Sequence, residues 1–137
     1  MDTRSKILTA DAARALAGPL VVITGYFDVL RAEHAREIEA IRSQAGACTL
    51  LALVLPYAGE VFDIHARARM VAALRMVDYV LVADELDADE LVKSLRPQTV
   101  IHLEADDVRR NREIAERIRR RSGPGNFDSD TASEPRP

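Results

Sequence analysis

The sequence predicts a three-layer α/β/α fold in which helices cover both faces of a mostly parallel sheet. Short, mostly apolar runs alternate with longer segments whose apolar residues recur every three or four positions. This is the pattern of strands that alternate with helices. Strands without a polar side are typical of a parallel sheet, because its crossover helices bury both faces.

Four apolar runs are expected to form the sheet. The first, "LVVIT", lies between Pro19 and Gly25 and is rich in β-branched residues, which favour strands. We expect this first strand to be central in the sheet. The predicted strands are 20–24, 48–55, 78–83 and 99–103.

The segments between these runs have helical periodicity. Leu30, His34 and Ile38 share one helix face, which continues to about Gly46. A second helix is expected over 63–77 with Asp63 as its N-cap, and a third over 87–95. A short helix after Thr9 should precede the first strand.

The 137 residues suit one domain of ordinary size. We predict a helical N-terminal segment at 1–18, an α/β domain at 19–121 and a disordered tail at 122–137. The tail is rich in Gly, Pro, Ser and Asp and has little apolar surface to bury.

Composition narrows the classes of partner. The net charge of −3 creates no field that would attract nucleic acid or a membrane, and the arginine-rich run at 109–121 is interrupted by acids. Cys48 is the only cysteine, which excludes an intrachain disulfide and a multi-cysteine metal site. Without a signal-like start or a long apolar span, the chain is expected to be cytoplasmic.

The stretch from Gly25 to His34 is the candidate site, because ligands of open α/β sheets bind beyond the carboxyl ends of the strands. Gly25 allows a sharp turn, and the amides of Tyr26, Phe27 and Asp28 are expected to donate to an anion at the start of the next helix.

Two side chains on that first helical turn could bind the same phosphate. Arg31 supplies a permanent charge and His34 a titratable donor. His34 also aligns with the inward face of the helix, so a buried structural histidine is the alternative interpretation. His102, near the end of a strand, could border the pocket, and His65 is expected at the surface. No histidine has partners at metal-ligand spacing.

These residues resemble the cytidylyltransferase-like nucleotidylyltransferases. "VVITGYFDVLRAEHAREI" is similar to the first strand, the Gly-x-Phe-Asp turn and the His-x-Gly-His helix start of that family. The segment 67–102 is similar to a later part with an Arg-led helix, a Val-Asp-Tyr-Val strand and a Leu-x-Pro turn.

The resemblance implies a Rossmann-like fold and transfer of a nucleoside monophosphate from CTP or ATP, with Mg²⁺, to a phosphate or alcohol. It assigns a catalytic role to His34 and phosphate contact to Arg67, and it matches Asp28 to the aspartate of the turn. It also suggests a homodimer. No other cofactor is expected.

The departures from the family pattern bear on activity. Arg31 stands at the position of the first signature histidine, and Glu33 stands at the position of the glycine. A carboxylate there would crowd and repel a nucleotide. The Lys-Gly-Gly-Asp segment is replaced by "HLEADD", and the Ser-Thr-Thr helix start is missing.

Two functional hypotheses follow. In the first, the active site is degenerate and the chain binds nucleotide or anion weakly, or acts through a protein partner in a regulatory role. In the second, it is an active cytidylyl- or adenylyltransferase in which Arg31 replaces the histidine, because arginine can stabilise the charge of phosphoryl transfer.

Overall fold

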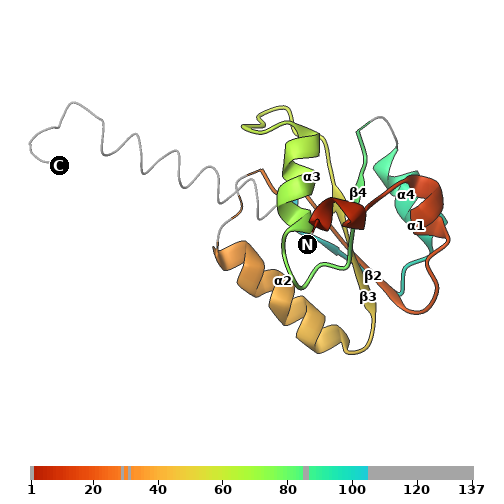
Figure 1. Ribbon diagram of the computed structural model, residues 1–137. Coiled ribbons are helices and arrows are strands. Elements are labelled where there is room, and N and C mark those ends of the chain that lie inside the picture. The colour runs from red at the N-terminus through yellow and green to blue at the C-terminus, as the bar shows by residue number, and fades with distance from the viewer. Residues whose placement is uncertain (1, 29, 31, 85–86, 105–137) are drawn as a thin grey trace, which may run out of the picture. The chain divides into compact units, whose positions relative to one another are not determined.

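The computed structural model describes residues 2–28, 30, 32–84 and 87–104 (Figure 1). The chain divides into two units, Met1–Glu104 and Ala105–Pro137. Only the first unit is described below. The predicted helix over 106–121 and the predicted tail over 122–137 lie outside the described residues.

The first unit is built on a five-stranded sheet in which every pairing is parallel. The strand order is β1-β4-β3-β2-β5. This confirms the predicted fold class. The strands are β1 (Ile7–Leu8), β2 (Leu20–Gly25), β3 (Thr49–Val54), β4 (Tyr79–Val82) and β5 (Thr99–His102).

The sheet differs from the sequence-based prediction in two respects. The middle strand is β3, whereas β2 lies between β3 and β5, so the expectation that 20–24 is central was wrong. Strand β1 was not predicted, because a two-residue strand has no periodicity. It pairs with β4, Ile7 opposite Val80, and so adds an edge strand from the N-terminal segment.

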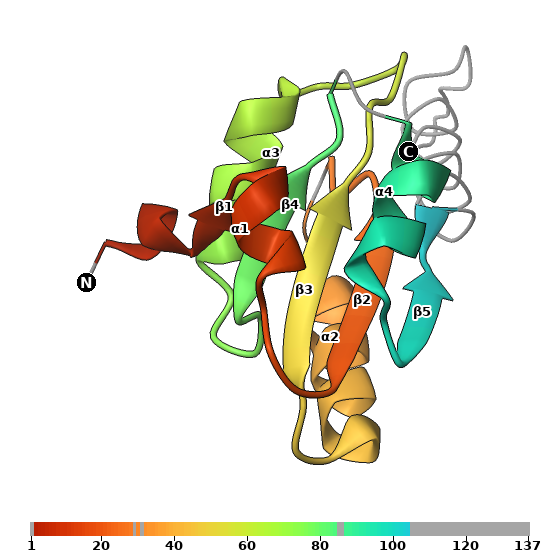
Figure 2. The same ribbon diagram turned by 90° about the vertical axis from the view of Figure 1, so that its right-hand side faces the viewer.

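Helices cover both faces of the sheet (Figure 2). α1 and α4 pack on one face, in a core that includes Val22 and Leu91, and α2 and α3 pack on the other, in a core that includes Ile23 and Val71. The helices are the 3₁₀ turn η1 (Thr3–Lys6), α1 (Ala10–Arg14), α2 (Ala32–Ala45), α3 (Ile64–Ala72) and α4 (Ala88–Leu95).

The predicted N-caps at Thr9 and Asp63 are confirmed, and Asp87 is a third cap that was not predicted. The side chains of Thr9, Asp63 and Asp87 accept backbone N–H groups at the starts of α1, α3 and α4. These bonds satisfy donors that a helix start leaves without an intrahelical acceptor.

Helix α3 ends earlier than predicted, at Ala72 rather than at residue 77. Leu74 and Val77 instead belong to the turn before β4, where their carbonyl oxygens accept hydrogen bonds from Lys6 Nζ at 3.1 and 2.9 Å. These hydrogen bonds come from a residue about 70 positions away in the chain, so helix propensity in 63–77 does not predict them.

Burial is deepest in the strands at the middle of the sheet. All six residues of β2 are buried, as are five of the six in β3. Burying an aliphatic side chain contributes about 1.5 to 3 kcal/mol, so these strands form a rigid base for the loops that follow them. Within the described residues, no helix is long and apolar enough to cross a bilayer.

Candidate functional site

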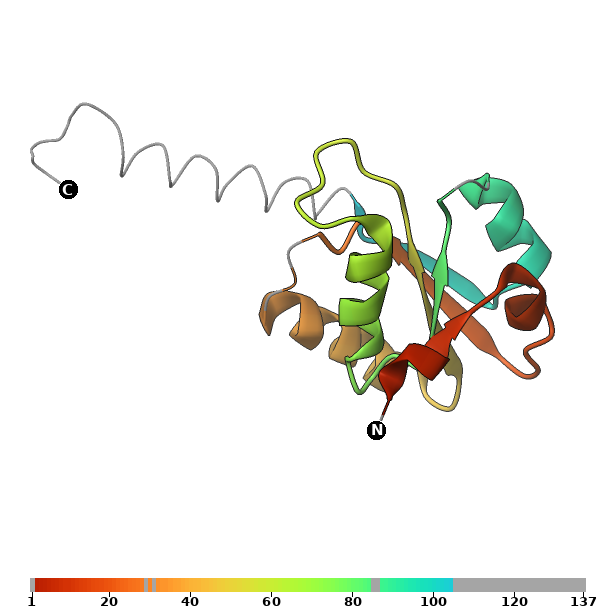
Figure 3. The ribbon, with the colours of Figure 1, turned by 45° about the horizontal axis from the view of Figure 1, so that its top comes forward.

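The candidate site lies at the carboxyl edge of the sheet, where β2 leads through residues 26–31 into α2. The neighbouring strand β3 leads into α3 through residues 55–63, a connection that Figure 3 shows as an arch ending at the start of α3. The two loops lie side by side, because Leu55 N donates to Gly25 O at 2.9 Å. Their contacts determine which side chains are accessible at this edge.

Asp28 binds the second loop to the first. Its carboxylate is buried, with 3% of the residue exposed, and it accepts hydrogen bonds from the amides of Val61 (2.8 and 2.9 Å) and Phe62 (3.0 Å). A buried carboxylate needs such donors, because removing it from water is costly. Asp28 therefore fixes the end of the 55–63 loop.

Arg67, on α3, contacts both loops from the interior of the protein. It is fully buried, and its guanidinium donates to three carbonyl oxygens and one carboxylate. These acceptors are Tyr26 O (2.6 Å), Leu55 O (2.8 Å), Phe62 O (3.0 Å) and Glu60 Oε2 (2.8 Å). Four of the five N–H donors of an arginine are thus paired with the protein itself.

The turn itself is formed differently from the expected glycine turn. Gly25 is the last residue of β2, and the left-handed backbone conformation occurs at Phe27, with φ of +50°. This conformation is unfavourable for a residue with a side chain. Burial of the Phe27 ring offsets the cost. Next to it, the rings of Tyr26 and Tyr57 stack with centroids 4.5 Å apart and join the two loops again.

Helix α2 places the remaining predicted residues on different sides. His34 is buried, with 3% exposed, on the face that also carries the buried Ile38. Glu33 is exposed in the first turn of the helix. Arg31 lies outside the described residues. The buried position of His34 agrees with the structural alternative; the catalytic role implied by the resemblance stays a prediction.

A second set of polar side chains lies at this edge, and the sequence predicted it only in part. Thr24 Oγ1, at the end of β2, donates to Glu104 Oε1 at 2.7 Å and lies 2.8 Å from His102 Nδ1, at the end of β5. His102 Nδ1 is also 3.4 Å from Glu104 Oε2. We name these three residues the edge cluster. The sequence indicated His102 alone, because the pairing of β2 with β5 that joins it to Thr24 has no local signal.

The start of α3 carries the clearest electrostatic effect near the site. The backbone N–H of Ala66, together with a smaller contribution from that of His65, holds the pKa of the Asp63 carboxyl below its ordinary value. Stabilising the ionised form in this way is the usual effect of an N-cap hydrogen bond.

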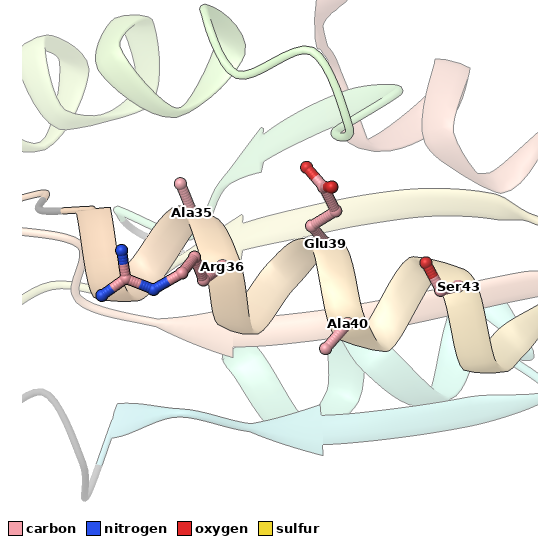
Figure 4. Close-up of a pocket in the computed structure, with 5 residues that line it drawn as sticks. All are labelled: Ala35, Arg36, Glu39, Ala40 and Ser43. Atoms are coloured by element: carbon pink, nitrogen blue, oxygen red, sulfur yellow. The ribbon is translucent and has the colours of Figure 1, made fainter.

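A shallow hollow on the exposed side of α2 does not belong to this edge (Figure 4). It is lined by Ala35, Arg36, Glu39, Ala40 and Ser43, all from the same helix. Since no second element contributes a side chain, the hollow presents no converging polar groups. Among the described residues, no group of three histidine, cysteine or acidic side chains is placed to hold a metal ion.

Sheet order, layers and the two loops define a three-layer α/β protein of Rossmann-like type. No family model matches the chain. The bifunctional protein HldE of Wolinella succinogenes is 29% identical over 115 residues, which cover 73% of this chain and 24% of HldE. The chain therefore spans about a quarter of the length of this curated relative.

A solved structure shares the fold. The lipopolysaccharide core biosynthesis protein of Thermoplasma volcanium GSS1 matches with a TM-score of 0.53 and 22% identity, over 60% of this chain and 71% of that one. The two likenesses support a nucleotidylyltransferase-like fold for this chain. At this level of identity the structural match concerns the fold alone.

Proposed function

We propose that this chain is a nucleotidylyltransferase-fold protein whose active site is degenerate. It binds a nucleotide or another anion weakly or not at all, and it acts through a protein partner in a regulatory role. The likeness to HldE and to the lipopolysaccharide core biosynthesis protein supports the fold part of this proposal. The residues at the carboxyl edge support the degenerate site.

The observation that carries the proposal is the use of Arg67 within the protein. The family resemblance assigns this side chain to phosphate, yet it is fully buried and donates to Tyr26, Leu55, Phe62 and Glu60. A guanidinium with four donors already paired has little capacity left for a ligand.

Glu33 also supports a degenerate site. It occupies the glycine position of the signature, in the first turn of α2, with an exposed side chain. A carboxylate about 4 Å from a phosphate repels it by up to about 4 kcal/mol at the dielectric typical of a protein surface. Its side chain also fills space that a glycine leaves for the ligand. Both effects weaken nucleotide binding.

The second candidate function is an active cytidylyl- or adenylyltransferase with Arg31 in place of the first histidine. It is supported by the Gly25 to Asp28 turn at the carboxyl edge, the position at which an enzyme of this fold class would bind its nucleotide. The acceptor would be a phosphate or an alcohol.

Titration of the protein with CTP and with ATP, each with Mg²⁺, separates the two candidates. Calorimetry measures affinity, amide shifts at residues 24–34 locate binding, and release of pyrophosphate reports transfer. We expect weak or undetectable binding and no pyrophosphate. Sustained pyrophosphate release by the unaltered protein with a phosphorylated acceptor would overturn the degenerate-site proposal.

A double variant tests whether the signature changes are responsible. Arg31→His with Glu33→Gly restores the histidine pair and removes the carboxylate, so nucleotide affinity should rise at least several-fold. Glu39→Gly is the matched control, because it removes an exposed glutamate from the same helix and has the same glycine cost. An equal affinity of double variant and control would place the defect elsewhere.

A further inference from the structure

The loop over 55–63 carries a pair of apolar side chains at the molecular surface. In the part of the chain that the structure describes, the large hydrophobic residues that are exposed are Val61, at 70%, and Phe62, at 43%. A single exposed apolar residue is ordinary on a protein surface. These two are adjacent in the sequence and lie on the arch that leads into α3 (Figure 3). We name them the apolar tip.

The backbone of the apolar tip is fixed by buried polar side chains. The amides of Val61 and Phe62 donate to the Asp28 carboxylate, and the carbonyl oxygen of Phe62 accepts from Arg67 Nε at 3.0 Å. Asp28 and Arg67 are both buried. The main-chain groups of the tip are thus bonded to the interior, while its side chains are exposed to solvent.

The first half of the loop is also closely packed. The Tyr57 ring stacks on the Tyr26 ring, with centroids 4.5 Å apart, and a Cβ added at Gly59 would lie 3.3 Å from the Tyr57 ring. A surface that is ordered before binding loses little conformational entropy when a partner binds, so more of the contact energy contributes to affinity. The loop is therefore suited to presenting the apolar tip.

The charges next to the apolar tip are acidic. The segment 55–64 contains Glu60 and Asp63 and no basic residue. The Glu60 side chain is 39% exposed, whereas Arg67, its partner at 2.8 Å, is fully buried and presents no charge at the surface. The backbone N–H of Ala66 holds the pKa of the Asp63 carboxyl below its ordinary value, so this group is ionised at neutral pH.

The adjoining turns of α3 do not reverse this charge. They carry Arg69, whose charge acts on Asp63, and His65, which lies 3.6 Å from Asp84. Around the tip, exposed carboxylates of the described residues therefore outnumber exposed permanent cations. The apolar tip lies between carboxylates, and a complementary surface has to be apolar at its centre and basic at its border.

We propose that the apolar tip docks into an apolar pocket, bordered by basic side chains, on the surface of a partner protein. The inference rests on the proposed function, in which this chain acts through a protein partner. Val61 and Phe62 fill the pocket, and Glu60 and Asp63 pair with lysine or arginine at its border. A carboxylate accepts from several donors, so Glu60 can accept from a second cation while it holds Arg67. Asp28 acts through the loop as a positioning residue.

The same charges disfavour two other occupants. An anionic membrane surface would be repelled by Glu60 and Asp63. A second copy of this chain, docked tip to tip about a two-fold axis, would bring each of these carboxylates close to those of its partner. Both occupants are retained as outcomes of the test.

Photocrosslinking in the cells that make this chain identifies what covers the tip. The photoreactive residue p-benzoylphenylalanine would replace Phe62 in the full chain. In a control it would replace Arg75, whose side chain is 91% exposed in the turn before β4. We expect a covalent adduct with another protein from position 62 and not from position 75. No adduct from position 62, or an adduct only with lipid or with a second copy of this chain, would overturn the proposal.

Affinity measurements on the purified pair then show whether the tip carries the binding. Val61→Ser should weaken it about tenfold or more, the loss typical of an interface hot spot. It should leave the melting temperature within about 2 °C, because the side chain is exposed. Ala47→Ser is the control: it makes another exposed apolar residue polar, in the turn before β3 at the opposite edge of the sheet. Equal affinity of the two variants would overturn the proposal.

Salt tests the basic border of the proposed pocket. Raising the salt concentration from about 0.05 M to about 0.5 M should weaken the purified pair several-fold, because it screens charges of opposite sign. Glu60→Gln should reduce this salt dependence. Affinity that stays constant or rises with salt would contradict a basic partner surface.

The positioning role of Asp28 has a separate readout. Asp28→Asn should weaken partner binding several-fold, although the exposed side chains of the tip are unchanged. Leu91→Ala is the matched control, because it destabilises the core on the other face of the sheet without touching the loop. Equal affinity of these variants would contradict the role of the fixed loop. Nucleotide titration and pyrophosphate release do not involve the tip, so failure of this inference is distinguishable from failure of the degenerate-site proposal.

Discussion

Arg67→Met is the sharpest test of how this edge of the sheet is held together. Methionine keeps an unbranched stem of similar length in the core but removes every donor of the guanidinium. The carbonyl oxygens of Tyr26, Leu55 and Phe62 then lose a charged donor, and Glu60 loses its ion-pair partner. Both loops should loosen together.

The expected size follows from these contacts. Breaking a buried charged network by removing one partner costs about 3 to 5 kcal/mol. The Glu60 contribution is the weakest part, because 39% of its side chain is exposed and water can replace the arginine. We therefore expect a loss of about 3 kcal/mol in the free energy of unfolding. For a unit of this size, that lowers the melting temperature by roughly 12 °C or more.

Urea denaturation followed by far-ultraviolet circular dichroism measures the loss. The matched control is Arg69→Met, an exposed position on the same helix, which should change stability by less than about 0.5 kcal/mol. If Arg67→Met is as stable as this control and instead weakens binding of sulfate or nucleotide, Arg67 is a ligand contact and the reasoning from its buried contacts is wrong.

Four further outcomes are expected. Asp28→Asn should cost about 1 to 3 kcal/mol of stability, because the amide oxygen accepts the hydrogen bonds from two backbone amides more weakly than the carboxylate does. In a double-mutant cycle with Arg67→Met the two losses should be less than additive, because both residues hold the same loop. Asp63→Asn should lower the melting temperature at pH 7. Because the pKa of Asp63 is lowered in the folded protein, its contribution to stability is present above the ordinary carboxyl range and disappears as the pH falls through the folded value. The melting temperatures of the variant and the unaltered protein should therefore converge in thermal scans from pH 7 down to pH 2. Arg31→Ala should weaken sulfate binding, followed by amide shifts at residues 24–34, by roughly 1 to 3 kcal/mol. Unchanged affinity would place Arg31 away from the anion. Removal of 122–137 should leave the melting temperature within about 2 °C, and a larger fall would show that this segment docks.

Within the described residues, the sequence alone predicted β2 to β5 and α1 to α4, but not β1 or the end of α3. The wholly apolar runs at 20–24 and 48–55 became buried strands because continuous β-branched and aliphatic residues suit a sheet covered on both faces. The caps at Thr9 and Asp63 could be predicted because the side chain and the amide that it binds lie within a few residues of one another. Such signals are local, and so they survive in a one-dimensional pattern.

Only the tertiary structure determined which polar residues form hydrogen bonds with one another. Asp28 accepts amides from residues 61 and 62, Arg67 donates to Tyr26, and Thr24 lies beside His102. These partners are separated by 33 to 78 positions in the chain. Periodicity shows which face of an element is apolar, but it does not show which strand becomes its neighbour. Strand order depends on how whole faces of the helices and the sheet pack against one another. In this packing Asp28 and Arg67 are buried, and both hold the loops in place.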